Sequence, residues 1–155
     1  MNRESRPCQR AEAHMNEYSK IRDWFAQWSA FVANVDFESA RALFDESVVG
    51  FGTYKDLVHG LDNLETGQWR NIWPTIADFA FDLDSLEVIV STDGSQASAV
   101  IFWDSTGFHE DGSRYDRPGR ATVVLKQIDG EWRGVHTHFS LRPAEKKLSF
   151  GRSDD

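Results

Sequence analysis

A β-hairpin between Arg120 and Leu141 is the feature that most constrains what this chain can fold into. The segment reads RATVVLKQIDGEWRGVHTHFSL, with β-branched and aromatic residues on both sides of the turn Ile128-Asp129-Gly130-Glu131. Asp-Gly readily adopts the positive φ angles that a tight hairpin turn requires. The sequence therefore predicts two long antiparallel strands here.

The two faces of this hairpin differ in chemistry, because side chains alternate along a strand. One face is nearly all apolar and carries Ala121, Val123, Leu125, Val135, Thr137, Phe139 and Leu141. The other is mixed and carries Arg120, Thr122, Val124, Lys126, Trp132, His136, His138 and Ser140. We expect the apolar face to cover a core or cavity, and the mixed face to meet water or another subunit.

The N-terminal half predicts a long amphipathic helix. Apolar residues recur at steps of three and four from Tyr18 to Val35, which gives a wide aromatic stripe. Residues 1–15 are polar and lack this period, so we expect a flexible leader there. A single domain is expected over 16–143, and a flexible tail over 144–155.

Two shorter helices and a strand follow. Asp36 is expected to cap a helix that reaches Phe44, and the segment SVVGFGT reads as a short strand. Asp62 and Glu65 resemble a capping box, which predicts a third helix that Pro74 ends.

From residue 77 onward the pattern predicts only strands, over 77–90, 96–108 and the hairpin, with turns at Asp93-Gly94 and Asp111-Gly112. Helices first and a long antiparallel sheet afterwards make an α+β architecture. We expect the sheet to wrap the long helix and to leave a cone-shaped cavity.

Charge and composition exclude several partners. The 155 residues carry a net charge of −8 and no basic stripe, so we expect no nucleic-acid partner. No apolar run is long enough for a membrane helix, so we expect no membrane partner either. Cys8 is the single cysteine, which is typical of a reducing compartment and indicates the cytoplasm. Six tryptophans and eleven phenylalanines fit either an aromatic pocket or a large aromatic core.

Several strings resemble a known family: VDFESA (35–40), LVHGLD (57–62), NIW (71–73) and DGEWRGVHTHFS (129–140). With the order of elements, they resemble the SnoaL-like branch of the nuclear-transport-factor-two and ketosteroid-isomerase fold. They are most similar to the association domain of calcium/calmodulin-dependent protein kinase. The resemblance implies a cystatin-like cone, in which a long N-terminal helix and two shorter helices pack on a curved, mainly antiparallel sheet. It implies no single activity, because this fold hosts isomerases, cyclases, dehydratases, binding modules and assembly domains.

The resemblance also implies a pocket. Arginines bind small carboxylates in the association domain, and the matching positions here are Asp104, Val123 and Phe139, none of them arginine. An apolar cavity for a small, neutral, hydrophobic ligand is therefore expected. The expected pocket residues are Phe51, Trp69, Trp73, Phe102, Val123 and Phe139.

Two functions follow as alternatives. In the first, the protein is a cofactor-independent isomerase, cyclase or dehydratase of a hydrophobic carbonyl compound. Asp104 would act as the general base and Tyr54 as the oxyanion donor. In the second, the domain binds a ligand or assembles without catalysis, and the sheet surface makes the oligomer. The alternative for Asp104 itself is a position in solvent. No motif for nucleophilic, phosphoryl or hydride chemistry is present, and no cofactor is expected.

The mixed face of the sheet is expected to form a homodimer. Trp103, Trp132, His136 and His138 would make an aromatic, hydrogen-bonding interface patch. The two histidines lack a definite third ligand, so no metal site is predicted.

Overall fold

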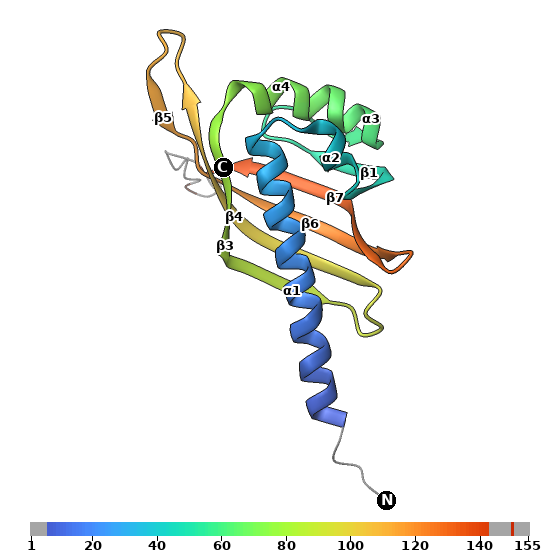
Figure 1. Ribbon diagram of the computed structural model, residues 1–155. Helices are drawn as coiled ribbons and strands as arrows, with labels where there is room; N and C mark the ends of the chain where they lie inside the picture. Colours follow the sequence, from blue (N-terminus) through green and yellow to red (C-terminus); the bar gives the residue numbers. More distant parts are fainter. Residues whose placement is uncertain (1–5, 143–149, 151–155) are drawn as a thin grey trace, which may run out of the picture.

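The structure is a computed structural model that describes residues 6–142 and residue 150 (Figure 1). Its helical segments are α1 (Arg6–Ala33), α2 (Phe37–Arg41), α3 (Leu61–Leu64), the π-helical turn η1 (Glu65–Trp69), α4 (Arg70–Ile72) and the 3-10 turn η2 (Trp73–Thr75). Its strands are β1 (Phe44–Phe51), β2 (Val58–His59), β3 (Ala77–Val90), β4 (Gln96–Phe108), β5 (Arg114–Asp116), β6 (Gly119–Ile128) and β7 (Glu131–Leu141). The leader residues 1–5 and almost all of the expected tail lie outside the described residues.

One sheet of seven strands has the order β2-β1-β7-β6-β4-β3, with β5 paired to the far end of β4. All neighbours are antiparallel except β1 and β7, which run parallel. The predicted hairpin is confirmed: Ile128 pairs with Glu131, and Asp129 and Gly130 have φ angles of 52° and 79°. The predicted α+β cone with a long N-terminal helix and a mainly antiparallel sheet is confirmed.

Helix α1 lies across one face of the sheet, hereafter the inner face (Figure 1). The expected aromatic stripe packs into the core, where Ile21, Trp24, Phe25, Trp28 and Val32 are buried. The helix begins at Arg6, so residues 6–15 of the expected flexible leader are helical in the structure. Residues 11–16 are exposed, and the first turns of α1 extend beyond the sheet in Figure 1. None of the helices described is both long and apolar enough to cross a membrane.

The predicted cap of α2 is confirmed, because the Ser39 amide donates to Asp36 Oδ1 at 3.1 Å. The helix ends earlier than expected, at Arg41, and Phe44 already begins β1. The cause lies in packing: Phe44 is buried as the first residue of β1, where it pairs with Gly134 of β7.

The third helix departs from the expected capping box. Gly60 occupies the N-cap position and makes no side-chain cap. Asp62 and Glu65 instead bind Arg41, at 2.7 and 3.1 Å. Burial raises the pKa of the Glu65 carboxyl, but hydrogen bonds from Arg70 and Arg41 outweigh it, and the net pKa lies below its usual value. This ion network ties the helical segment 61–75 to α2.

A β-bulge in β7 changes which side chains reach the inner face. Val135 has no partner on β6, because its two neighbours pair with the consecutive residues Val124 and Leu125. The extra residue reverses the alternation of side chains on the N-terminal side of the bulge. Trp132 therefore faces α1 and is buried, and its indole N–H donates to Glu17 Oε2 at 2.7 Å. The expectation that Trp132 belongs to the mixed outer face is wrong.

Candidate functional site

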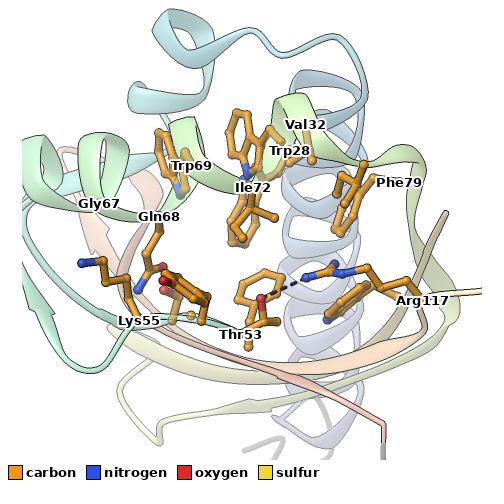
Figure 2. Close-up of a pocket in the computed structure, with 17 residues that line it drawn as sticks. Trp28, Val32, Thr53, Lys55, Gly67, Gln68, Trp69, Ile72, Phe79 and Arg117 are labelled. Atoms are coloured by element: carbon orange, nitrogen blue, oxygen red, sulfur yellow. Dashed lines mark hydrogen bonds between the residues drawn. The ribbon is translucent and has the colours of Figure 1, made fainter. Parts of the chain in front are cut away.

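A cavity of about 60 Å³ lies between the inner face of the sheet, α1 and the helical segment 61–75 (Figure 2). Its apolar wall consists of Trp28, Val32, Trp69, Ile72, Trp73, Ile76, Phe79, Trp103 and Phe139. Its remaining lining residues are Gly52, Thr53, Tyr54, Lys55, Gly67, Gln68, Arg117 and Thr137. Tyr54 and Lys55 are exposed, so the cavity opens to solvent beside them.

The apolar wall is dominated by aromatic rings that hold one another in place. Trp69 and Trp73 stack with their ring centroids 4.8 Å apart. Trp28 meets Phe139 edge to face at 5.3 Å, and Trp103 lies 6.0 Å from Phe139. Such contacts add to the stabilisation from area burial and fix ring orientation. The wall is therefore a preformed apolar surface with flat faces.

The π-helical turn η1 places two of the lining residues. Gln68 and Trp69 belong to it, and the Gln68 side chain extends towards the cavity (Figure 2). Gln68 is only 8% exposed, and its Nε2 donates to the Gly50 carbonyl at 3.5 Å, the outer limit of a hydrogen bond. Short π-helical turns inside α-helices occur frequently at functional sites. This turn brings a buried, weakly satisfied amide to the cavity.

Arg117 comes from the segment between β5 and β6, and its backbone is bonded at both polar atoms to Ser105 of β4. Its amide donates to the Ser105 carbonyl, and its carbonyl accepts from Ser105 Oγ, both at 2.8 Å. Its side chain then reaches the cavity, where Nη2 donates to Thr53 Oγ1 at 3.0 Å, the dashed line in Figure 2. The guanidinium carbon lies 5.4 Å from the centre of the Trp103 ring.

The Arg117 guanidinium lacks an anionic partner. In the part of the chain that the structure describes, no carboxylate lies within ion-pair distance of it, and its side-chain partners are the neutral hydroxyls of Thr53 and Ser105. Burial accordingly lowers the pKa of Arg117 from its usual value. An arginine therefore does line the cavity, although it comes from none of the three matching strand positions.

Two indole N–H groups in the wall are also unsatisfied. Trp28 Nε1 and Trp103 Nε1 are buried and have no hydrogen-bond partner among the described residues. An unpaired buried donor is unfavourable, and its dipole leaves positive potential in its surroundings. The cavity wall therefore contains two buried donors without an acceptor among the described residues.

The residues predicted for the pocket divide into two groups. Trp69, Trp73 and Phe139 line the cavity, as does Tyr54, which was predicted as the oxyanion donor. Phe51 and Phe102 lie on the outer face of the sheet with exposed side chains, and Val123 is buried without reaching the cavity.

Asp104 does not reach the cavity, because β4 presents the opposite face from the one expected. Trp103 and Ser105 point to the inner face and are buried, whereas Asp104 and Phe102 are exposed. An exposed carboxylate on the far side of the sheet cannot act as a base on a ligand in the cavity. Tyr54 lines the mouth of the cavity with 78% of its surface exposed, and so it is a solvated rim residue.

The expected interface patch is also divided, by the face of β4 for Trp103 and by the bulge in β7 for Trp132. Trp103 is 1% exposed and belongs to the core, as does Trp132. His136 and His138 remain on the outer face, where both rings lie beside Phe51, with centroids 6.1 and 5.2 Å away. No three histidine, cysteine, aspartate or glutamate side chains within the described ranges are placed to hold a metal ion.

The comparisons with known proteins agree with this architecture. No functionally curated protein sequence shows significant similarity to this chain. A nuclear transport factor 2-like superfamily protein from Salmonella enterica serovar Typhimurium superposes with a TM-score of 0.74 at 20% identity, over 90% of this chain and 99% of that one. A ketosteroid isomerase-like protein from Erwinia carotovora superposes with a TM-score of 0.69 at 16% identity, over 81% and 95%.

A protein from Xanthomonas campestris, described as a calcium/calmodulin-dependent protein kinase II association domain, superposes with a TM-score of 0.65 at 19% identity, over 78% of this chain and 84% of that one. These identities establish the shared fold and no shared activity. The family model of the SnoaL-like domain matches residues 21–145, a range that includes all seven strands described. The chain therefore belongs to the SnoaL-like domain family.

Proposed function

We propose that this protein binds a small compound with a flat, apolar body in the cavity beneath α1. The observation that carries the proposal is the aromatic wall, which surrounds a space connected to solvent at Tyr54 and Lys55. Flat apolar surfaces with a few converging polar groups are typical of small-molecule sites. About 60 Å³ is room for roughly five water molecules at about 10–15 Å³ each. The enclosed space therefore takes no more than one ring, and the rest of a ligand would lie in the open mouth beside Tyr54 and Lys55.

The residues that line the cavity support binding of a ligand without removal of a proton from it. Among the described residues, no aspartate, glutamate or histidine lines the cavity, and Asp104 lies on the outer face. A general base has to lie within hydrogen-bond reach of the proton that it removes. We therefore propose a ligand-binding protein in place of the isomerase that uses Asp104 as its base.

Filling the cavity tests this function. Ile72 lines the cavity and is only partly buried, so Ile72→Phe should occupy the space and leave the fold intact. Wild-type protein is expected to melt at a higher temperature in millimolar benzamide or benzoate, because a ligand that binds only the native state stabilises it. The Ile72→Phe variant should lose this shift, measured by thermal unfolding with tryptophan fluorescence.

Ile89→Phe is the matched control, because the same substitution there falls on an exposed position of β3. It should keep the full ligand-induced shift. Equal shifts in wild type and in Ile72→Phe would place the bound compound elsewhere and refute the proposal.

We also propose that the outer face of the sheet makes a homodimer. Phe51, Val100 and Phe102 are exposed large apolar residues on this face, and His136 and His138 lie beside Phe51. Clustered apolar side chains on an otherwise polar surface favour association.

Phe102→Arg should convert the dimer to a monomer in sedimentation velocity at micromolar concentration, because an interface core does not tolerate an unpaired charge. Phe108→Arg is the control. It changes a phenylalanine of the same strand with nearly the same exposure, 41% against 43%, in the part of β4 that pairs with β5. Wild-type protein that sediments as a monomer would overturn the dimer.

A further inference from the structure

We infer that the ligand of this cavity is a small aromatic acid whose carboxylate is bound by Arg117. The inference rests on the proposed function, since it names the class of compound that the same cavity receives. It differs from the neutral ligand that the strand positions Asp104, Val123 and Phe139 suggest, because the cation comes from another segment, between β5 and β6.

The charge of the cavity is opposite to that of the protein. The chain has a net charge of −8, yet the charged lining residues are Lys55 and Arg117, both cationic. Neither has an ion-pair partner in the described residues, whereas Arg22, Arg41, Arg70, Arg114 and Arg133 each have one. A positive, partly enclosed site in an acidic protein attracts and retains an anion.

The Arg117 guanidinium is held in place before any ligand arrives. Two backbone bonds to Ser105 fix its main chain, and Thr53 Oγ1 and the Trp103 ring fix its side chain. A guanidinium carries five N–H donors, and Thr53 and Ser105 account for only part of them. The remaining donors suit the paired oxygens of a carboxylate, which arginine binds through two parallel hydrogen bonds.

The other polar groups of the cavity reinforce this preference. The Gln68 amide reaches the same space with a hydrogen bond at the limiting distance, and the Trp28 and Trp103 indoles contribute unpaired donor dipoles. A neutral apolar ligand would leave Arg117 desolvated without a counter-charge, which is unfavourable. A cationic ligand would be repelled. An aromatic acid satisfies the guanidinium and the aromatic wall together.

Benzoate and benzamide form the test pair, because they share size and shape and differ in charge. In low-salt buffer at neutral pH, wild-type protein should bind benzoate at least about tenfold more tightly than benzamide, in line with hydrogen bonds to charged groups. Titrations followed by tryptophan fluorescence measure both affinities. This comparison needs no variant, so it does not depend on whether a substitution folds.

Arg117→Met keeps an unbranched apolar side chain near Trp103 and removes the charge. It should reduce benzoate binding by about tenfold or more and benzamide binding by much less, so that the preference for benzoate is lost. Arg114→Met, on the exposed strand β5, is the matched control and should change neither affinity.

Benzamide binding with no preference for benzoate would overturn the inference and leave the proposed function standing. Equal losses of benzoate binding in Arg117→Met and Arg114→Met would also overturn it, because they would reveal a general charge effect. Absence of binding by both compounds would overturn the proposed function and the inference with it.

Discussion

Replacing Trp28 with alanine should lower the free energy of unfolding by about 4 kcal/mol, which is typical of a large aromatic side chain removed from a core. Trp28 is the centre of the aromatic core: its ring contacts Trp24, Phe44, Phe81 and Phe139, with centroid distances of 5.1, 4.9, 5.2 and 5.3 Å. These rings come from α1, β1, β3 and β7, so alanine would leave a cavity where all four elements meet. Urea unfolding at 25 °C measures the loss.

Phe108→Ala is the control for Trp28. Phe108 is an exposed aromatic residue near the end of β4, so its truncation should change the free energy of unfolding by no more than about 0.5 kcal/mol. Similar losses at the two positions would mean that Trp28 is not the structural centre of the core.

Replacing Gly119 with alanine should lower the free energy of unfolding by about 3 kcal/mol, at the upper end of the usual range for overpacking. Gly119 lies opposite Trp103 in the pairing of β6 with β4, and the edge of the indole occupies the space of a Gly119 side chain. A Cβ there would clash with Trp103 Cζ2 and Cε2 and lie 2.6 Å from the Ser140 carbonyl oxygen. Neither the buried indole nor the paired backbone can move freely, so the strain remains.

Gly67→Ala provides the contrast for Gly119. Gly67 lies in the π-helical turn, and the nearest atom to an added Cβ is Val58 Cγ1 at an ordinary 3.9 Å. Alanine there should be neutral or raise the free energy of unfolding by up to about 1 kcal/mol, because glycine is unfavourable in helices. The same added methyl group is expected to have opposite effects at the two sites, and equal losses in urea unfolding would contradict the argument.

The strand segments could be predicted from the sequence because their signals are local. The bounds of β3 and β4 and the turn at Asp129-Gly130 follow from β-branched runs separated by Asp-Gly. The form of the third helix was harder to predict. Its apolar residues recur as in an α-helix, and nothing in that pattern indicates the π-helical turn at Glu65–Trp69. Glu65, the first residue of that turn, binds Arg41, which lies 24 positions earlier in the chain.

The face of β4 was not predictable from its sequence alone. Both of its faces are apolar in the middle, with Ile101 and Trp103 on one and Val100 and Phe102 on the other, so alternation does not choose between them. A shift by one residue exchanges every side chain between the faces. This single shift accounts for the misplacement of Asp104, Phe102 and Trp103 together.

Arg117 was missed for a different reason. It lies outside the predicted strands, and no spacing or motif marks it. Its partner Thr53 is 64 positions earlier in the chain. Contacts between connecting segments of this kind form only after the strands have paired. The strands, and not the sequence of each segment, determine where the segment lies.

Because Val135 is unpaired, the number of residues in β7 matters as much as their identity. On one side of Val135, Trp132 is committed to α1 through Glu17, and on the other side His136 and His138 face outward. Loss of that one residue from the gene would leave every other amino acid intact, yet one half of the strand would have to turn over. We therefore expect this hairpin to tolerate exchanges of one side chain for another better than changes of length.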